Sequence, residues 1–244
     1  MPELPEVEIM SRNLRKWLGA SPVSVVSLEA GLPSVHMGPV EVERRGKYCL
    51  IHGSPGTLVL HFRMTGKVVL GRHERARAVF EGERAVSFVD TRRLGTLELV
   101  EDVVLPLGPE PWPEKHDGAW WKERFRRKRG PLKPALLDQK CVAGLGNIAA
   151  SELCWRIGVD PRRPVPEITD AEWAHLAEQA WAFLDQVIEA EDSDEIQYLN
   201  ADPGAKNPFS VYGREGERCP TSGLTIVRLV QSGRSTFWVP GHQV

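Results

Sequence analysis

The chain has 244 residues, a formal net charge of −2 at pH 7, 41% hydrophobic residues and 26% charged residues. This length fits one large domain or two modest ones. The composition is typical of a soluble globular protein and excludes a disordered chain, a collagen or a coiled coil. No apolar run approaches the ~20 residues of a membrane helix, so no membrane partner is expected. No secretory leader is expected either, and four scattered cysteines favour a reducing, cytoplasmic setting without a disulfide framework.

The charges are unevenly distributed along the chain. Residues 121–163 contain 11 Lys and Arg against 4 Asp and Glu, whereas residues 164–195 contain 10 Asp and Glu and no Lys or Arg. The local field, rather than the total charge, decides whether a polyanion binds. The asymmetry therefore keeps nucleic acid open as a partner in spite of the negative net charge.

The first segment of the chain combines one helix with many short strands. Apolar spacing from Val7 to Leu18 predicts a helix that ends near Gly19. Pro5 suits its first turn, and Glu6 complements its N-terminus. Many short β-rich runs at close spacing then predict a sandwich or a barrel. The predicted strands are 23–28, 48–51, 57–62, 67–70, 76–80, 85–89 and 95–100.

The rest of the chain is predicted to be helical and then β-rich again. The proline-rich segment 105–113 is interpreted as a linker. Helices are expected over 134–139, 148–155 and 172–188, the last one capped by Asp170. The last 37 residues carry turn glycines at Gly223 and Gly233. We therefore expect an α+β fold in three parts: an N-terminal β-sandwich over 1–113, a helical part over 114–207 and a C-terminal β-hairpin over 208–244.

Pro2 is the most unusual residue for chemistry. A small second residue permits removal of Met1, which leaves proline as a free secondary amine. An α-amino group titrates near ~8, so part of it is unprotonated at neutral pH. Such an amine condenses with an aldehyde-equivalent carbon to a cationic iminium, which is an electron sink. Glu3 lies beside it as a possible general acid or base. On this chemistry alone, an ordinary N-terminus remains the favoured interpretation.

A series of motifs in fixed order favours a reactive N-terminus over an ordinary one. The motifs are Met1–Glu8, Arg44–Tyr48, Arg63–Gly66, Asp90–Gly95, Leu136–Glu152 and Val211–Glu217. Together they resemble the formamidopyrimidine-DNA glycosylase and endonuclease VIII family over nearly the whole chain. Leu4-Pro5 and Arg92-Arg93 are more similar to the formamidopyrimidine branch.

The resemblance implies a bifunctional DNA glycosylase and AP lyase of base-excision repair, which acts on damaged, mainly oxidised bases extruded from the duplex. It implies that Pro2 attacks C1′ of the sugar and that Glu3 protonates the opening sugar. Lys47 would support the Schiff-base chemistry, and Arg234 would grip phosphate and assist the δ-elimination. No metal or organic cofactor is expected. The implied partner is double-stranded DNA with a damaged base or an abasic site, bound by a monomer.

The same resemblance implies a set of DNA contacts. Met64 would fill the gap left by the extruded nucleotide, with a core methionine as the alternative. Arg92 would reach the orphaned partner base, flanked by Arg93 and Leu94. The family usually has Phe where Leu94 stands and Pro where Thr91 stands, which weakens the expected stacking on the partner base. The other implied contacts are His73, Arg129, Lys133 and Asn147.

Two of these contacts belong to recognisable local patterns. Arg129 ends a basic run, 122–129, that is either a solvated face or a phosphate-binding stripe, and the second interpretation explains its arginine density better. Asn147 ends a Gly-x-Gly-Asn turn before a helix, where free N–H groups suit phosphate. In the family this turn belongs to the helix–two-turn–helix element.

The sequence also departs from the family. Of the four cysteine positions of the C-terminal zinc finger, only Cys219 and His242 remain as plausible ligands, so a zincless hairpin is expected. Packing of four residues would hold it instead. Those residues are Ile226, Leu229, Phe237 and Trp238.

The segment that covers an extruded purine in the formamidopyrimidine branch corresponds to 189–209. It is acidic here, and a solvated loop away from the duplex is its favoured interpretation. An oxidised purine, an oxidised pyrimidine and an abasic site all remain open as substrates. A non-catalytic protein that binds damaged DNA is the alternative function.

Overall fold

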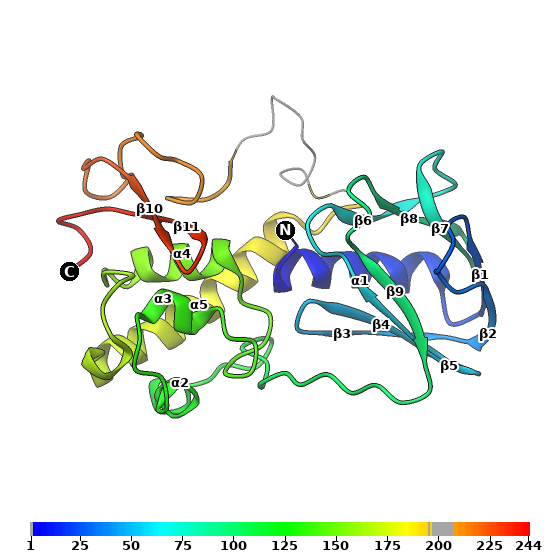
Figure 1. Cartoon of the computed structure of the whole chain (residues 1–244), viewed down its shortest axis with the longest axis horizontal. Helices are drawn as coiled ribbons and strands as arrows, with labels where there is room; N and C mark the ends of the chain where they lie inside the picture. The colour runs from blue at the N-terminus through cyan, green and yellow to red at the C-terminus, as the bar shows by residue number, and fades with distance from the viewer. Residues whose placement is uncertain (1, 195, 197–206) are drawn as a thin grey trace. The chain divides into compact units, whose positions relative to one another are not determined.

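The computed structural model of the chain describes residues 2–194, 196 and 207–244, which form two compact units (Figure 1). The sheet unit comprises the described residues up to Pro106 together with Ile188–Ile196. The helical unit comprises Leu107–Val187 and the described residues from Asn207 onward. The boundary lies within the proline-rich segment 105–113. None of the helices in the described ranges is long and apolar enough to span a bilayer.

Helix α1 (Leu4–Leu18) is the core of the sheet unit. Its apolar stripe is buried, with Leu14, Trp17 and Leu18 all 0% exposed. It contacts strands of both sheets of the unit. The helix ends at Gly19, whose φ of 64° is a conformation that favours glycine.

Two antiparallel sheets build the rest of this unit. One has the strand order β2-β1-β7-β8-β6 and the other the order β3-β4-β5-β9. The strands are β1 (Pro22–Ser27), β2 (Val35–Pro39), β3 (Glu41–Arg45), β4 (Tyr48–Gly53), β5 (Gly56–His61), β6 (Gly66–Leu70), β7 (Ala76–Glu81), β8 (Ala85–Asp90) and β9 (Thr96–Val100).

Strands β2 and β3 were not predicted from the sequence. Both are edge strands; β3 buries only alternate residues, and β2 buries only Met37. Their sequences carry proline, glycine and charged residues, which edge strands tolerate and which weaken the β pattern. The other strands and the helix lie where the sequence predicts them.

The helical unit is built on an aromatic stack. Its helices are α2 (Gly118–Phe125), α3 (Leu132–Leu136), α4 (Asn147–Arg156) and α5 (Asp170–Ala190). Trp121 stacks on Phe125, and Phe125 stacks on Trp173 of α5 at a ring distance of 5.6 Å. Asp170 does not cap α5 as predicted, because it is the first helical residue. Thr169 caps it instead, through reciprocal hydrogen bonds with Glu172.

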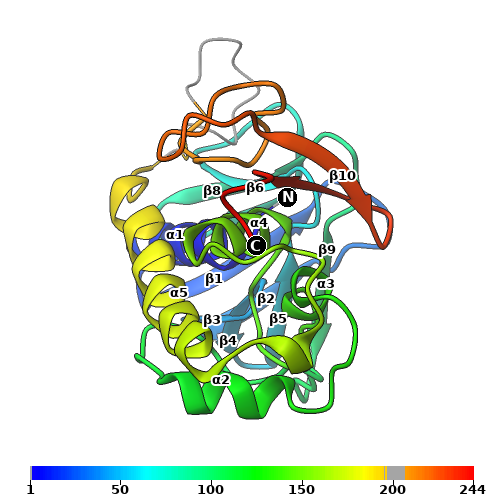
Figure 2. The same ribbon diagram turned by 90° about the vertical axis from the view of Figure 1, so that its left-hand side faces the viewer.

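The C-terminal hairpin pairs β10 (Val227–Gln231) with β11 (Arg234–Trp238) and packs on α4 (Figure 2). Ser232 and Gly233 form its turn with φ values of 48° and 73°, which is the signature of a type I′ turn. Its base is held by an apolar cluster that includes Ile226 and Phe237 but not Leu229, which is only partly buried. The described part of the fold is thus α+β, with sheets, helices and a terminal hairpin in the predicted order.

Candidate active site

Pro2 and Glu3 are held by the first turn of α1. Pro2 is buried, and Glu3 is the N-cap residue and only 2% exposed. The Glu3 carboxylate accepts the backbone N–H of Glu6, while Glu6 Oε2 accepts the backbone N–H of Glu3 at 2.6 Å. Such a reciprocal cap fixes the entry of the chain into the helix. Glu3 therefore lies on rigid support, and Pro2 is buried directly before it, as a reactive terminus beside a fixed carboxyl requires.

Lys47 lies at the tip of the β3–β4 hairpin, in a two-residue turn whose Gly46 has a φ of 58°. Arg44 connects this turn to α1. Its Nε donates to Glu8 Oε2 at 3.0 Å, and its Nη1 donates to the Gly46 carbonyl at 3.2 Å. Burial raises the pKa of Glu8, but the charges and hydrogen bonds of Arg44 and Arg15 together outweigh it and lower the pKa overall. One ionised, buried pair thus ties the Lys47 turn to the helix that carries the N-terminus.

His61 is a residue of this region that the sequence analysis missed. Its ring packs edge-on against Tyr48 with centroids 4.6 Å apart, and its Nδ1 accepts the backbone N–H of Arg63 at 3.1 Å. Burial, together with the charges of Arg63 and Lys47, lowers the pKa of His61 to about 4. The imidazole is therefore neutral at physiological pH and adds no positive charge beside Lys47.

Met64 and Arg92–Leu94 lie on two connections that cross between the sheets. The β5–β6 connection carries Met64, and the β8–β9 connection carries Arg92–Leu94 in the opposite direction. Gly66, the first residue of β6, pairs with Asp90, the last residue of β8. The two connections therefore leave the five-stranded sheet at the same end of its strands. Met64 is 44% exposed and Leu94 45% exposed, which argues against a core methionine. Exposed apolar side chains at this end of the strands fit the predicted insertion between bases.

Asp90 holds the two connections together. Its side chain is fully buried. Oδ1 accepts the Thr65 hydroxyl and the Arg92 backbone N–H, and Oδ2 accepts the Gly95 backbone N–H at 2.6 Å and Arg77 Nη1 at 3.3 Å. Burial raises the pKa of Asp90, but these hydrogen bonds lower it overall. Asp90 is therefore an ionised anchor for the Met64 and Arg92 connections.

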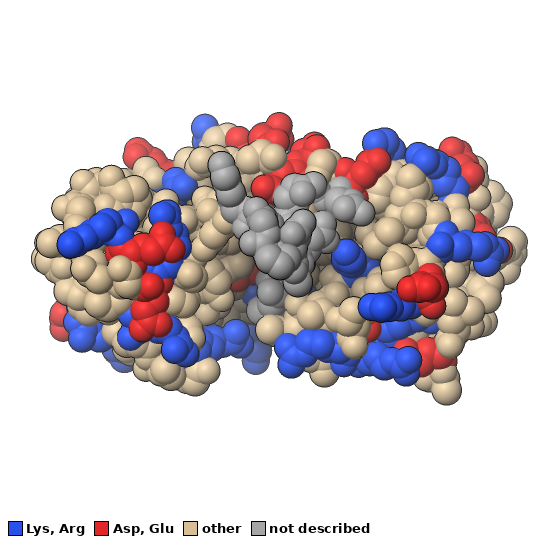
Figure 3. All heavy atoms as spheres, turned by 90° about the horizontal axis from the view of Figure 1, so that it is seen from above, with Lys and Arg blue, Asp and Glu red and all other residues tan. Residues whose placement is uncertain are grey.

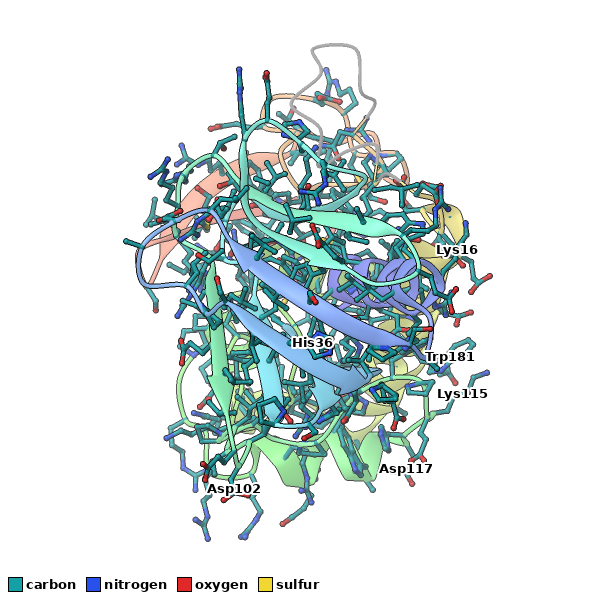
Figure 4. All side chains as sticks on the ribbon, turned by 90° about the vertical axis from the view of Figure 1, so that its right-hand side faces the viewer. Lys16, His36, Asp102, Lys115, Asp117 and Trp181 are labelled. Atoms are coloured by element: carbon teal, nitrogen blue, oxygen red, sulfur yellow. The ribbon has the colours of Figure 1, made fainter. Side chains whose placement is uncertain are left out.

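We expect Asp90→Asn to loosen both connections. Asparagine replaces one acceptor oxygen by a donor, which costs about 1–3 kcal/mol of unfolding free energy. Because the folded pKa of Asp90 lies below 3.8, the stability it adds is present at neutral pH and lost as pH falls through that lowered pKa. Urea unfolding at pH 7 measures the loss, and trypsin cleavage after Arg63 and Arg92 should accelerate about tenfold. Asp102→Asn, at an exposed aspartate of the same unit (Figure 4), should change neither quantity; an equal effect of both variants would rule out the anchor.

The Gly-x-Gly-Asn turn of the helical unit is shaped by Gln139. Its Nε2 donates to the Leu145 carbonyl at 2.8 Å, and its Oε1 accepts the Gly144 N–H at 2.9 Å. Gly144 has a φ of 87°, which favours glycine. Asn147 then begins α4. The Asp-Gln and Gly-x-Gly-Asn parts of one motif are therefore parts of one turn.

Lys133, a predicted DNA contact, is buried beside Asn147 and the hairpin. Its side chain is 0% exposed, and its Nζ donates to Asn147 Oδ1 at 2.6 Å, Thr236 Oγ1 at 2.8 Å and the Ser235 carbonyl at 2.9 Å. These three protein acceptors already hold the ammonium, and its contact with DNA stays a prediction. Asn147 Nδ2 also donates to the Ser235 carbonyl at 2.9 Å. Lys133 therefore fixes Asn147 beside the strand that begins with Arg234.

Glu152 connects two motifs that are far apart in the sequence. It is 1% exposed. Its Oε1 accepts the backbone N–H groups of Val211 and Tyr212 at 2.8 and 2.9 Å, and its Oε2 accepts that of Ser210 at 3.1 Å. One buried carboxylate thus holds the chain that leads into the hairpin against α4.

The remaining predicted contacts are exposed cationic or titratable side chains. His73 lies between β6 and β7, Arg129 follows α2, and Arg234 is the first residue of β11. Their accessibility is consistent with phosphate binding, and their roles stay predictions. Lys, Arg, Asp and Glu side chains are all spread over the face drawn in Figure 3. The charges on this face therefore do not by themselves locate a DNA-binding surface.

Cys219 lies in the apolar cluster at the base of the hairpin. Burial raises its pKa, but hydrogen bonds, among them that from Ser222, lower it overall. Its Sγ also accepts Trp155 Nε1–H at 3.3 Å. In the described ranges, no three His, Cys, Asp or Glu side chains gather as a metal site would require. The zincless character of the hairpin stays a prediction.

The described part of the acidic segment lies on α1. Asp192 pairs with Arg12 at 2.8 Å, Asp194 pairs with Lys16 at 3.0 Å, and the Ser193 carbonyl accepts Asn13 Nδ2 at 2.9 Å. These acids are thus partly neutralised within the sheet unit. Most of the predicted base-covering stretch, residue 195 and residues 197–206, lies outside the described residues.

Comparisons with known proteins agree over both units. Residues 1–97 match the model of the formamidopyrimidine-DNA glycosylase N-terminal domain, and residues 107–197 match that of the formamidopyrimidine-DNA glycosylase H2TH domain. The formamidopyrimidine-DNA glycosylase of Gluconobacter oxydans is 36% identical over 279 aligned positions, which cover 100% of both chains. That of Streptococcus pneumoniae is 32% identical over 273 positions, covering 100% of this chain and 99% of the relative.

Solved structures are similar over the same length. The crystal structure of MutM (Fpg) from Thermus thermophilus has a TM-score of 0.84 at 34% identity, covering 99% of this chain and 98% of that one. A complex of Lactococcus lactis Fpg with DNA containing an abasic site has a TM-score of 0.83 at 27% identity and covers 99% of each chain. The similarity is therefore not confined to one unit or one motif.

Proposed function

Because the chain belongs to the formamidopyrimidine-DNA glycosylase family, we propose that it is a base-excision-repair DNA glycosylase that also cleaves the strand as an AP lyase. The observation that carries this proposal is the reciprocal cap that fixes Glu3 at the start of α1, directly after the buried Pro2. A protein that only bound DNA would gain nothing from a rigidly presented imino terminus. We further propose that the enzyme acts as a monomer in the cytosol.

The proposed reaction begins at the Pro2 nitrogen. The unprotonated amine attacks C1′ of the extruded nucleotide, and the bond from C1′ to the base breaks while the base leaves with a proton. Glu3 protonates the ring oxygen as the sugar opens, which gives an iminium between Pro2 and C1′. Lys47, on the turn that Arg44 ties to α1, stabilises the neighbouring phosphate.

Strand cleavage follows from the iminium. Loss of a proton from C2′ expels the 3′ phosphate, and a second elimination expels the 5′ phosphate. Water then hydrolyses the remaining iminium and restores the amine. Arg234 assists the second elimination by binding the leaving phosphate.

The lesion that the enzyme prefers is proposed to be an oxidised base. Structures of the Lactococcus lactis relative contain Fapy-dG in one case and an oxidised pyrimidine in another. These two complexes support a substrate range that includes both ring types. An assay panel of single lesions in otherwise identical duplexes distinguishes them.

Borohydride trapping tests the proposed chemistry. Hydride reduces the iminium to a stable amine, so the protein and a duplex with an abasic site should form a covalent adduct. Peptide mapping should place the DNA on Pro2, in a chain from which Met1 has been removed. An undamaged duplex should give no adduct. Tight binding of abasic DNA without any adduct would overturn the proposal and favour a protein that only binds damaged DNA.

A further inference from the structure

A buried cation near the start of β7 joins two connections of the sheet unit. Arg77, the second residue of this strand, has a side chain that is only 8% exposed. Its guanidinium donates twice to Glu29, from Nε to Oε2 at 2.7 Å and from Nη2 to Oε1 at 3.2 Å. Its Nη1 donates to the Gly95 carbonyl at 2.8 Å and to Asp90 Oδ2 at 3.3 Å. Each nitrogen of the guanidinium therefore binds an acceptor within the unit.

The two joined segments are the β1–β2 connection and the β8–β9 connection. Glu29 lies on the first of them. Asp90 ends β8 and Gly95 directly precedes β9, so Arg77 Nη1 bridges the two ends of the connection that carries Arg92. The Arg77 network, which consists of Glu29, Arg77, Asp90 and Gly95, thus closes the base of this connection and fastens it to the β1–β2 connection.

The backbone between these two ends is constrained. Arg93 has a φ of 53°, a left-handed conformation that residues other than glycine rarely adopt and that persists only where the surroundings hold it. Its N–H donates to the Asp90 carbonyl at 3.2 Å. A Cβ on Gly95 would lie 2.9 Å from the Phe88 ring and 3.1 Å from Asp90 Oδ2, so the backbone at the other end is closely packed. The conformation of the connection therefore depends on contacts at both of its ends.

The charges of the network make Arg77 difficult to replace. The hydrogen bonds from Arg77 lower the pKa of Glu29 against the opposing effect of its burial, and the pKa of Asp90 is lowered as well. Both carboxylates are therefore ionised at neutral pH, and Arg77 is the cation between them. Removal of Arg77 would take away the cation bound to the fully buried Asp90 carboxylate, and an uncompensated buried charge is costly.

A cavity of about 510 Å³ distinguishes the two neighbouring arginines of the β8–β9 connection. Glu29, Arg77 and Asp90 line this cavity, and so does Arg93. Arg92 does not line it and is exposed. The two arginines therefore have different surroundings, because Arg93 shares a cavity with the network and Arg92 does not.

We propose that Arg77 and Glu29 are positioning residues that set which base the protein prefers opposite the lesion. They act through the β8–β9 connection, because Arg92 can read an unpaired base only if its backbone is held in one place. The inference rests on the proposed function and on the predicted contact of Arg92 with that base. It assigns no chemical step to either residue. It extends the recognition site to the β1–β2 connection, which carries none of the predicted DNA contacts.

Binding to an uncleavable duplex tests this role without the chemistry. The probe is a set of four duplexes that contain a tetrahydrofuran abasic analogue and differ only in the base opposite it. The analogue has no aldehyde and forms no iminium, so the result does not depend on the trapping experiment. The wild-type protein should bind the best of the four about tenfold more tightly than the worst, since one arginine fork discriminates between bases to this extent. Equal binding of all four would overturn the proposal.

Two variants of the network should weaken this preference. Arg77→Gln should reduce it from about tenfold to about twofold, because the arginine fork loses its fixed position. The mean affinity should stay within about threefold, because phosphate contacts dominate affinity for DNA. Glu29→Gln keeps one acceptor oxygen and loses the charge, so it should lower the preference by a smaller factor. A wild-type preference in Arg77→Gln would overturn the role of the network.

A double-mutant cycle with Arg92 separates positioning from general destabilisation. If Arg77 acts through Arg92, then Arg77→Gln should change the preference no further in a protein that already carries Arg92→Ala. Additive losses would contradict the proposal. The matched control is Val23→Ala, which removes two buried methyl groups from β1 and destabilises the same unit at a position outside both connections. It should keep the wild-type preference, and a loss equal to that of Arg77→Gln would show that the preference follows the stability of the unit rather than the position of Arg92.

Discussion

Substitution of Pro2 by glycine is expected to lower base excision by on the order of 10³-fold and to leave only traces of the borohydride-trapped adduct. Glycine still has an α-amine, but a primary amine gives a neutral imine that needs a further proton to become an electron sink. Glycine also lacks the ring that fixes the direction of the amine, and a displacement of ~1 Å at a reacting atom costs about 10²-fold in rate. Single-turnover excision and trapping assays measure the two losses.

Binding and a second proline provide the controls for this variant. The affinity for a duplex with an abasic site should stay within about twofold, because phosphate contacts dominate affinity for DNA. Pro5→Ala changes the other proline of the same helix start, within the first turn of α1, and does not touch the terminal amine. It should trap abasic DNA at the wild-type rate. If Pro2→Gly traps as well as Pro5→Ala, the nucleophile is another residue.

Local patterns were sufficient to predict most elements of the fold. Helix α1 is marked by the helical spacing of its apolar residues, and strands such as β5 and β8 are marked by continuous apolar runs. Strands β2 and β3 lack such a run, because each is an edge strand with at most two buried residues. The cap of α5 was misassigned because Thr169 and Asp170 are both good cap residues. Only the reciprocal hydrogen bonds with Glu172 distinguish them.

The exposed residues of the candidate site were predictable from the sequence. The buried residues that fix the position of those exposed residues were less so. Met64 and Arg92 are exposed at one edge of the sheet unit, and the motifs found them. Asp90, which joins their connections, could not be assigned without the strand register that brings the connections together. The burial of Lys133 was not predictable from its local sequence either. A lysine in a basic segment suggests solvent, but its ammonium is buried among acceptors from α4 and β11.

For Glu6, the structure shows a more specific role than its position in the sequence predicts. Its position in the first turn predicts a favourable interaction with the helix N-terminus. The structure adds a specific function, because its carboxylate accepts the backbone N–H of Glu3. This pairing makes Glu6 a matched control for its neighbour in the cap.

Glutamine in place of Glu3 should separate base removal from strand cleavage. The amide oxygen can still accept the Glu6 N–H, so the cap and the position of Pro2 are retained. The variant loses the carboxyl that protonates the opening sugar, and general acid catalysis of this kind contributes about 10²–10⁴-fold. Excision of a damaged base should fall by that factor. Trapping on a preformed abasic site should stay within about threefold, since the aldehyde is already open.

Glu6→Gln decides between a chemical and a structural explanation of that result. It alters the second carboxylate of the same buried cap and keeps an oxygen for the Glu3 N–H. It should therefore change excision and trapping by no more than about threefold. Single-turnover rates on paired lesion and abasic duplexes provide the comparison. If both variants lose excision and trapping in parallel, a disturbed helix start accounts for the loss, and Glu3 is a positioning residue rather than a catalytic acid.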